Sequence, residues 1–376
     1  MSRFGTVAGG VLALAGLLGA YGCGGGGGIS GNKTALPSGP QTSAPPSDKV
    51  IYASLSQSDA VVAYRVGSDG FLPGDPFDSI ALEEPRNVLV VGDILYVAQE
   101  EVVSSIQLLP DGSLPDSPTA TTAPIRDGDA SRMIVFGDML YVSWEGVDRI
   151  YAYPLSGGHV SVGSVSGSGD SGTNYVPIVR VGPYVYAGTR DQARIDAFRI
   201  LPDGSLNSIP EDQDPEARIF DCKDLIHRGG ILYAIEQDDR RIVTFTIQGG
   251  GRLPDEPDSK TQSRQAYAYL LLDGEDRLYA SAFNDGRTDL YIIPPGGLFT
   301  ENPRQREVAH TWSDTASFPT QMIIRDGILY VSQMGIGRID AYVLGADGSP
   351  PDFPSSSTFA LQDSYLNAIT MGSFPP

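Results

Sequence analysis

The sequence predicts an all-β protein in which seven four-stranded sheets close into a ring. The first observation is a short phrase of the type Gly-Asp-Ile-Leu-Tyr-Val, which recurs along the chain with its tyrosine at Tyr52, Tyr96, Tyr141, Tyr186, Tyr233, Tyr279 and Tyr330. The second is spacing, since consecutive tyrosines stand 44 to 51 residues apart, the length of one β-propeller blade. The third is a composition with 45 glycines, 28 prolines and 19% charged residues, which favours short strands and tight turns. Together they predict a seven-bladed β-propeller.

Each repeat continues with another strand and a tight turn. Six of the seven copies carry an aromatic residue at one position of this strand, which is held by Tyr64, Ile106, Tyr153, Phe198, Phe245, Tyr291 and Tyr342. An Asp-Gly pair follows in four copies and another glycine-containing pair in the rest. Glycine suits such turns because it adopts positive φ without a Cβ clash. We interpret the repeated tyrosines as scaffold, and replacing one of them by alanine is expected to cost about 3–5 kcal/mol.

A further strand precedes each tyrosine phrase and is predicted to lie innermost, beside the central channel. The last such strand, around Asn367, has no tyrosine phrase after it, and the first phrase, at Tyr52, has no such strand before it. The two ends are therefore expected to complete one blade together, with the segment around Asn367 alongside Ile51 and Tyr52. Such pairing closes two sheet edges that would otherwise stay open.

The N-terminus predicts export. Residues 1–22 combine a short basic start with an apolar core typical of a signal peptide, too short and too rich in glycine for a membrane-spanning helix. Cys23 follows in a context that resembles the lipobox of bacterial lipoproteins, which predicts a lipidated, membrane-anchored protein of the cell envelope. The alternative is cleavage after a small residue such as Ala20, which would give a secreted soluble protein. Residues 23–48 have the composition of a flexible tether, and 49–376 form the predicted propeller.

Charge and rare residue types limit the remaining possibilities. The net charge of −20 disfavours nucleic-acid partners and anionic lipid surfaces, so membrane contact is expected through the lipid anchor only. Cys222 is the only other cysteine and is expected to be a buried thiol in a monomeric protein. Two cysteines and three histidines exclude a zinc cluster, and no cofactor is expected. Asp127 and Asp129 fit a solvated turn better than a calcium loop.

Two further patterns imitate known sites without their context. The letters Gly-Asp-Ser-Gly at 169–172 occur in a Gly/Ser-rich loop with no matching histidine and aspartate, so we interpret them as a plain loop. His159 falls at a predicted turn and His310 in a predicted outer strand. His227 is the one histidine expected near an opening of the channel, opposite to the opening at Asn87.

The repeats "LYVSQMGIGRIDAYVLGADGSPP" (329–351) and "VYAGTRDQARIDAFRILPDGSLNS" (185–208) resemble the lactonase-like, YVTN-type seven-bladed propellers, which include the propeller form of 6-phosphogluconolactonase. The resemblance extends over residues 50–376 and implies the same fold. It implies an active site with His, Arg and Glu near one channel mouth. The family's Pro-Arg-Asn type phrase matches at Pro85-Arg86-Asn87, whereas no histidine of this chain occupies the equivalent position.

Alignment of the repeats predicts a polar ring at the start of the inner strands. The positions equivalent to Asn87 are Arg132, Pro177, Asp224, Tyr269, Gln321 and Asn367. Packing does not require such side chains there, so we predict a ligand-binding mouth formed by Arg86, Asn87, Arg132, Lys223, Asp224, Tyr269, Gln321 and Asn367. The alternative interpretation is that they cap strand ends or bind channel water.

Two functions are compatible with these residues. The first is an exported module that binds a small molecule or a protein at the propeller mouth without catalysis. The second is hydrolysis of a lactone or sugar ester, which needs an activated water and a cation to hold the developing oxyanion. Arg132, Asp224 and His227 are the candidates for those roles. The scarcity of histidines favours the binding module.

Overall fold

A computed structural model describes residues 46–161, 166–169, 173–208, 210, 219, 221–261, 266–274, 276–299, 305–308, 318–361 and 364–374. The chain divides into two compact units, Met1–Pro37 and Ser38–Pro376, and the fold that follows is that of the second. The predicted signal peptide, Cys23, the tether up to residue 45 and His310 lie outside the described residues. In the described part of the chain, no helix is long and apolar enough to cross a membrane.

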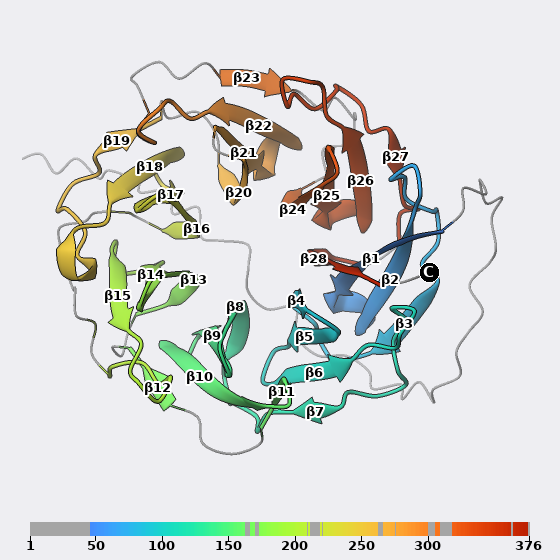
Figure 1. Ribbon diagram of the computed structural model, residues 1–376, viewed down its shortest axis with the longest axis horizontal. Coiled ribbons are helices and arrows are strands. Elements are labelled where there is room, and N and C mark those ends of the chain that lie inside the picture. The colour runs from blue at the N-terminus through green and yellow to red at the C-terminus, as the bar shows by residue number, and fades with distance from the viewer. Residues whose placement is uncertain are drawn as a thin grey trace, which may run out of the picture. The chain divides into compact units, whose positions relative to one another are not determined.

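Seven antiparallel sheets are arranged in a ring, which confirms the predicted seven-bladed β-propeller (Figure 1). The inner strands are β4 (Asn87–Val91), β8 (Asp129–Phe136), β13 (Tyr175–Val181), β16 (Cys222–Arg228), β20 (Tyr267–Asp273), β24 (Pro319–Arg325) and β28 (Leu366–Ser373). The second strands, which carry the repeated tyrosines, are β5 (Ile94–Ala98), β9 (Met139–Glu145), β14 (Tyr184–Thr189), β17 (Ile231–Glu236), β21 (Arg277–Ala282), β25 (Ile328–Gln333) and β1 (Pro46–Leu55).

The outer half of each blade is built from the segment around the predicted turn. The third strands are β6 (Val103–Gln107), β10 (Arg149–Ser156), β15 (Ile195–Arg199), β18 (Arg241–Thr246), β22 (Arg287–Ile292), β26 (Arg338–Val343) and β2 (Ala60–Gly67). The outermost strands are β7 (Ala120–Thr121), β11 (His159–Val160), β12 (Ser166–Ser168), β19 (Ser259–Lys260), β23 (Gln305–Val308), β27 (Ser356–Ser357) and β3 (Asp78–Ala81). Short 3-10 helices are η1 (Ser56–Ser58), η2 (Gly249–Gly251), η3 (Phe283–Asp285) and η4 (Met334–Ile336).

The blades differ mainly at their outer edges. Five sheets have the predicted four strands. In the sheet that begins at β8, both β11 and β12 pair with β10, whereas the sheet of β13, β14 and β15 has three strands among the described residues. An isolated bridge between Ile200 and Leu206 extends this last sheet. The inner three strands are therefore the constant part of every blade.

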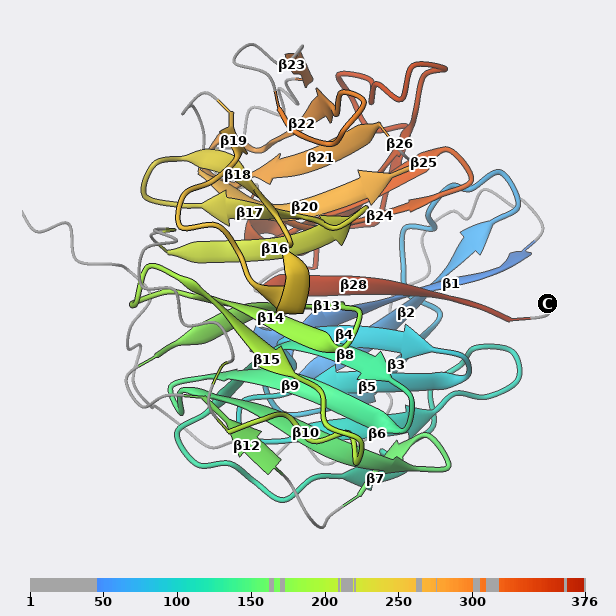
Figure 2. The ribbon, with the colours of Figure 1, turned by 60° about the vertical axis from the view of Figure 1, so that its left-hand side comes forward.

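The two chain ends close the ring as predicted. β28 pairs antiparallel with β1, with Met371 opposite Ile51 and Thr370 opposite Tyr52. Figures 1 and 2 show β28, at the red end of the chain, beside the blue β1. The blade order β28-β1-β2-β3 therefore joins residues more than three hundred positions apart in one sheet. Because β1 begins at Pro46, its pairing extends into the segment predicted as tether.

Every repeated tyrosine binds the turn of the next blade. Its hydroxyl donates to the carbonyl of the turn glycine, in the pairs Tyr52–Gly112 (2.5 Å), Tyr96–Gly158, Tyr141–Gly204 (2.8 Å), Tyr186–Gly251 (2.8 Å), Tyr233–Gly297 (2.7 Å), Tyr279–Gly348 (2.6 Å) and Tyr330–Gly70 (2.8 Å). The last pair joins the blade of β25 to the blade of β2, so these bonds run around the whole ring. These glycines have φ between 80° and 83°, and a Cβ would approach a side chain of the preceding blade to less than 3 Å. The turn position therefore requires glycine.

The hydrophobic core is divided among the interfaces between blades. One cluster joins Val50 and Tyr52 of β1 to Leu95 and Val97 of β5, and the other clusters are built in the same way around the ring. The fixed aromatic position of the third strand is buried, as predicted, at Tyr64, Tyr153, Phe198, Phe245, Tyr291 and Tyr342. Cys222 is a free thiol in this core, and burial raises its pKa well above the usual range. No single blade buries both of its faces, so the ring is the folding unit.

Replacement of Tyr186 by phenylalanine tests the contribution of the hydrogen bonds between tyrosine hydroxyls and turn glycines. Tyr186→Phe removes the buried bond to Gly251 and leaves that carbonyl without its donor, so it is expected to lower the free energy of unfolding by about 1–3 kcal/mol. Tyr184→Phe on the same strand is the matched control, because Tyr184 is half-buried and its hydroxyl forms no hydrogen bond with a described residue. Urea denaturation of both variants measures the difference. Equal stabilities would show that these hydroxyls do not hold the blades together.

Candidate polar site at the channel mouth

The polar ring is built on irregularities of the inner strands. Six of the seven pairings between inner and second strands shift register near the start of the inner strand, and the pairing of β4 with β5 does not. The displaced residues include Arg132, Pro177, Asp224, Gln321 and Asn367, five of the seven positions found by repeat alignment. A bulge removes its residue from the regular ladder and re-aims the side chain. The bulges thus turn these side chains out of the regular alternation of the strands.

Buried serines bond to the backbone at several of these bulges. They lie on the second strand, two residues after the repeated tyrosine, at Ser54, Ser143, Ser281 and Ser332. The Ser143 hydroxyl accepts the backbone N–H of Arg132 (3.1 Å) and donates to the carbonyl of Val176 on the next blade (2.7 Å). Ser332 likewise accepts the backbone N–H of Gln321 (2.8 Å). The sequence analysis missed these supports, although the recurring Tyr-x-Ser spacing signals them.

Arg132 and Asp224 form an ion pair across the mouth. A guanidinium nitrogen of Arg132 lies 3.2 Å from Oδ1 of Asp224, two blades away. The strand between them, β13, contributes Pro177 at the equivalent position, and the proline side chain cannot form a hydrogen bond. The side chain of Asp224 is 6% exposed and that of Arg132 is 21% exposed. The pair is therefore partly shielded from water while the arginine keeps access to the channel.

The environment of Asp224 is that of a buried acceptor. Its Oδ2 accepts the backbone N–H of Leu270 at 2.7 Å. Burial raises the pKa of Asp224, and the Arg132 charge and the backbone N–H groups of Leu270 and Leu225 oppose that rise. Because both carboxylate oxygens are occupied, Asp224 is better placed to hold Arg132 than to take a proton from water.

Tyr269 and Gln321 extend this network to the next blades. The Arg132 guanidinium lies over the Tyr269 ring, 4.8 Å from its centroid. The Gln321 side-chain amide donates to the Tyr269 hydroxyl (3.4 Å) and accepts the backbone N–H of Ile369 (2.9 Å). Burial raises the pKa of Tyr269, so its hydroxyl stays protonated at neutral pH. One chain of contacts thus runs from β8 through β16, β20 and β24 to β28.

The other predicted site residues stand apart from this network. Asn367 donates to the carbonyl of Pro85 (3.5 Å), at the loop before Asn87. Arg86 pairs with Glu84 (2.8 Å) and Asp129 (3.5 Å), and Lys223 pairs with Asp221 (2.9 Å). No contact links Asn87 to the network among the described residues.

His227 does not join Arg132 and Asp224. It lies one residue before the far end of β16 and is exposed. Desolvation by neighbouring atoms and the nearby Arg180 charge lower its pKa. The three catalytic candidates therefore divide into a pair at one mouth and a histidine toward the other.

No metal site is formed by the residues that the structure describes, where no group of three or more His, Cys, Asp or Glu side chains could hold an ion. Asp129, one of the two residues considered for calcium, instead pairs with Arg86. Of the Gly-Asp-Ser-Gly letters, residues 170–172 lie outside the described residues.

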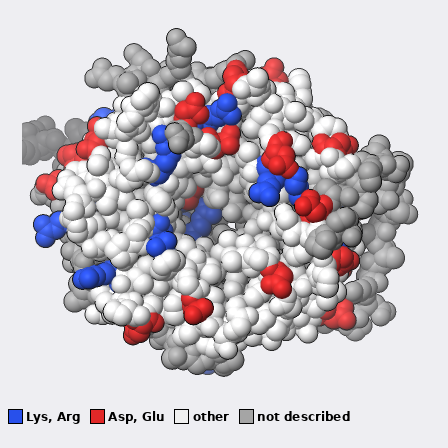
Figure 3. All heavy atoms as spheres, in the orientation of Figure 1, with Lys and Arg blue, Asp and Glu red and all other residues white. Residues whose placement is uncertain are grey.

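A pocket of about 380 Å³ opens from this network along the channel wall. Tyr269 and Gln321 line one end, and the walls come from β4, β20, β24 and β28. Figure 3 shows one face of the ring with a central hollow bordered by both basic and acidic side chains. The polar network therefore adjoins a space of the size that small-molecule sites occupy.

Comparison with known proteins supports the fold. No protein-family model and no curated protein matches the chain. Solved structures match closely in shape. A Bacteroides uniformis protein, provisionally named a 6-phosphogluconolactonase, has a TM-score of 0.69 at 15% identity and covers 86% of this chain and 99% of its own. The periplasmic gluconolactonase of Pseudomonas aeruginosa has a TM-score of 0.68 at 15% identity, covering 87% and 99%. A Lactobacillus plantarum protein has a TM-score of 0.69 at 10% identity, covering 86% and 99%. At these identities the likeness confirms a lactonase-like propeller fold and does not extend to activity.

Proposed function

We propose that the protein binds a small polyhydroxylated ligand of the sugar-acid or sugar-lactone class at the channel mouth, without turning it over. The observation that carries this proposal is the contact chain from Arg132 to Gln321, which joins polar side chains of four blades. Strand pairing does not need these side chains. A guanidinium, a phenol and an amide offer donors and acceptors to hydroxyl and carboxylate groups.

Lactone hydrolysis is the second candidate function. It is favoured by the presence of an acid and a cation within hydrogen-bond reach at one mouth, since Arg132 could hold an oxyanion. The names of two similar structures suggest the same chemistry. Two features weigh against it: both oxygens of Asp224 are engaged, and His227 lies toward the other end of its strand.

One experiment separates the two functions. Isothermal titration with gluconate measures binding, and acid release from glucono-lactone at constant pH measures hydrolysis. Arg132→Ala is expected to weaken gluconate binding roughly 10- to 100-fold, the value of one charged hydrogen bond. The control is Arg252→Ala, an exposed arginine on an outer turn, which should bind like the wild type.

The outcomes are distinct. Acid release above the spontaneous rate that disappears in Arg132→Ala would replace the binding proposal by hydrolysis. Failure of gluconate and glucono-lactone to bind the wild type, or equal affinity in Arg132→Ala, would contradict the mouth as the site for this ligand class.

We also propose an extracytoplasmic location with a lipid anchor at Cys23. It is supported by the N-terminal residues and by the periplasmic location in the name of the Pseudomonas aeruginosa neighbour. Fractionation of bacterial cells that express the full chain tests it. Recovery in the cytoplasm would contradict export, and recovery in the soluble envelope fraction would contradict the anchor.

A further inference from the structure

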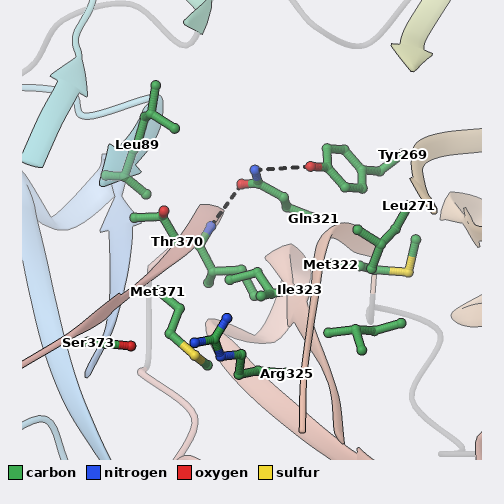
Figure 4. A pocket seen from close by; sticks show the side chains of 13 residues that line it. Leu89, Tyr269, Leu271, Gln321, Met322, Ile323, Arg325, Thr370, Met371 and Ser373 are labelled. Carbon is green, nitrogen blue, oxygen red and sulfur yellow. Dashed lines mark hydrogen bonds between the residues drawn. The ribbon is translucent and has the colours of Figure 1, made fainter. Parts of the chain in front are cut away.

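The channel pocket is long, and its two ends differ chemically. It follows β24 from Gln321 to Arg325, which spans roughly 13 Å at the rise of a β-strand. At the Gln321 end the polar groups are a neutral amide and a neutral phenol. At the opposite end they are the guanidinium of Arg325 and the hydroxyl of Ser373. Figure 4 shows the hydrogen-bonded Gln321 and Tyr269 at one end, and Arg325 beside Met371 at the other.

The walls between these ends are apolar. Leu89, Leu271, Ile323 and Met371 come from four different inner strands and face the same space (Figure 4). None of the described residues that line the pocket carries a carboxylate. The volume of about 380 Å³ lies in the range of ligand cavities. The pocket therefore suits a ligand whose middle part is hydrocarbon.

Arg325 forms no hydrogen bond or ion pair with the described residues, although its charge acts on the neighbouring Asp326. Among the residues that the structure describes, no carboxylate forms an ion pair with Arg325, and the adjacent acid, Asp326, is bonded to Lys49. Arg325 is exposed at the end of its strand, so it is hydrated and accessible from the channel opening. A guanidinium binds carboxylate groups in a bidentate, charge-assisted geometry.

Two further arginines occupy corresponding ends of inner strands. Arg180 is the last residue but one of β13. Its guanidinium carbon stacks on Phe136, 3.4 Å from the ring centroid. Arg228 ends β16. The Nε of Arg180 and Nη1 of Arg228 are buried and have no hydrogen-bond partner among the described residues. Asp273 ends β20, the inner strand between β16 and β24, and forms an ion pair with Arg277 (3.3 Å).

Three arginines, Arg180, Arg228 and Arg325, thus lie at this end of the inner strands, together with exposed acids such as Asp93 and Asp138 in the turns after β4 and β8. Among the described residues that line the pocket itself, Arg325 is the one charged side chain. Arg325 therefore favours an anionic group, and the apolar walls favour a ligand that also carries a hydrocarbon part.

We propose that the channel holds a second binding site for an amphipathic carboxylate, with the carboxylate at Arg325 and the hydrocarbon part between Leu89, Leu271, Ile323 and Met371. Burial of the hydrocarbon supplies affinity in proportion to the apolar area removed from water, and Arg325 fixes the orientation. This site goes beyond the proposed sugar-acid function and does not rest on it, because it is entered from the end remote from Arg132.

Octanoate is the probe for this site. Isothermal titration of the full chain is expected to show one octanoate site, with acetate and octanol each binding at least about tenfold more weakly because each lacks one of the two required parts. Arg325→Gln should weaken octanoate binding roughly 10- to 100-fold. Higher salt should weaken it as well, because salt screens the attraction between Arg325 and the carboxylate.

Two further variants test the position of the site and the specificity of the Arg325 effect. Ser373→Trp places a bulky side chain at the exposed rim of the pocket and should block octanoate while the unfolding temperature stays that of the wild type. Arg252→Gln removes an exposed arginine elsewhere and should leave octanoate binding unchanged. Octanol binding as tightly as octanoate, or unaltered octanoate affinity in folded Arg325→Gln, would overturn the proposal. Loss of gluconate binding in Arg132→Ala with octanoate binding retained would show that the two sites are separate.

Discussion

Removal of residues 366–376 is expected to abolish cooperative folding of the propeller. β28 and the residue after it serve both neighbouring interfaces. Leu366 and Ile369 pack toward β25 and β26, while Ala368 and Phe374 pack toward the β4 blade. Exposure of the three large side chains alone costs roughly 5–9 kcal/mol. That loss is comparable with the whole stability of an ordinary domain, about 5–15 kcal/mol. The open edge of β1 would add unpaired backbone groups.

Urea unfolding followed by circular dichroism measures this effect. The truncated chain should show no cooperative transition, whereas a chain that lacks only residues 375 and 376 should unfold like the full protein. Refolding of the truncated chain with a synthetic peptide of residues 364–376 should restore the transition. A cooperative transition at an unchanged midpoint without the peptide would show that closure by β28 is dispensable.

Replacement of Asp196 by alanine is expected to lower the free energy of unfolding by about 3–5 kcal/mol, because it leaves a charge unpaired in the blade. Asp196 is fully buried on β15 and binds Arg194 (2.7 Å) and the Tyr175 hydroxyl (2.6 Å). The same Arg-x-Asp pairing recurs as Arg287–Asp289 (3.0 Å) and Arg338–Asp340 (2.7 Å). The arginine is only 14% exposed in the Asp196 pair, so water cannot replace its partner fully.

A double variant distinguishes the pair from its members. Arg194→Met with Asp196→Leu removes both charges and should be less destabilising than Asp196→Ala alone, since no buried charge is left. Glu256→Ala, an exposed acid, is the control and should change stability by no more than about 0.5 kcal/mol. A loss in Asp196→Ala no larger than that of the control would mean that the pair is not a stabilising element.

Much of the fold could be predicted because each blade repeats the same local information. Seven tyrosine phrases, a fixed aromatic position and a fixed turn give the strand order inside a blade, and the unmatched ends give the closure of the ring. The mouth positions were found by the same alignment, and the structure brings Arg132, Asp224, Tyr269 and Gln321 into one network. Asn87 shares the aligned position, and Arg86 and Lys223 lie one residue before Asn87 and Asp224, but none of the three joins the network. Alignment places a residue along the strand without giving its side-chain direction.

The sequence by itself determined the seven blades, the innermost strand of each, the buried aromatic positions and the pairing of the two chain ends, because these follow from periodicity and from an incomplete first and last repeat. Only the tertiary structure decided which partners meet across the ring. The bulges at Ser143 and Ser332, the ion pair of Arg132 with Asp224 two blades away and the bond from each tyrosine to the next turn depend on the closed ring. Such contacts join residues on different blades, whose separation is set by closure and not by local sequence.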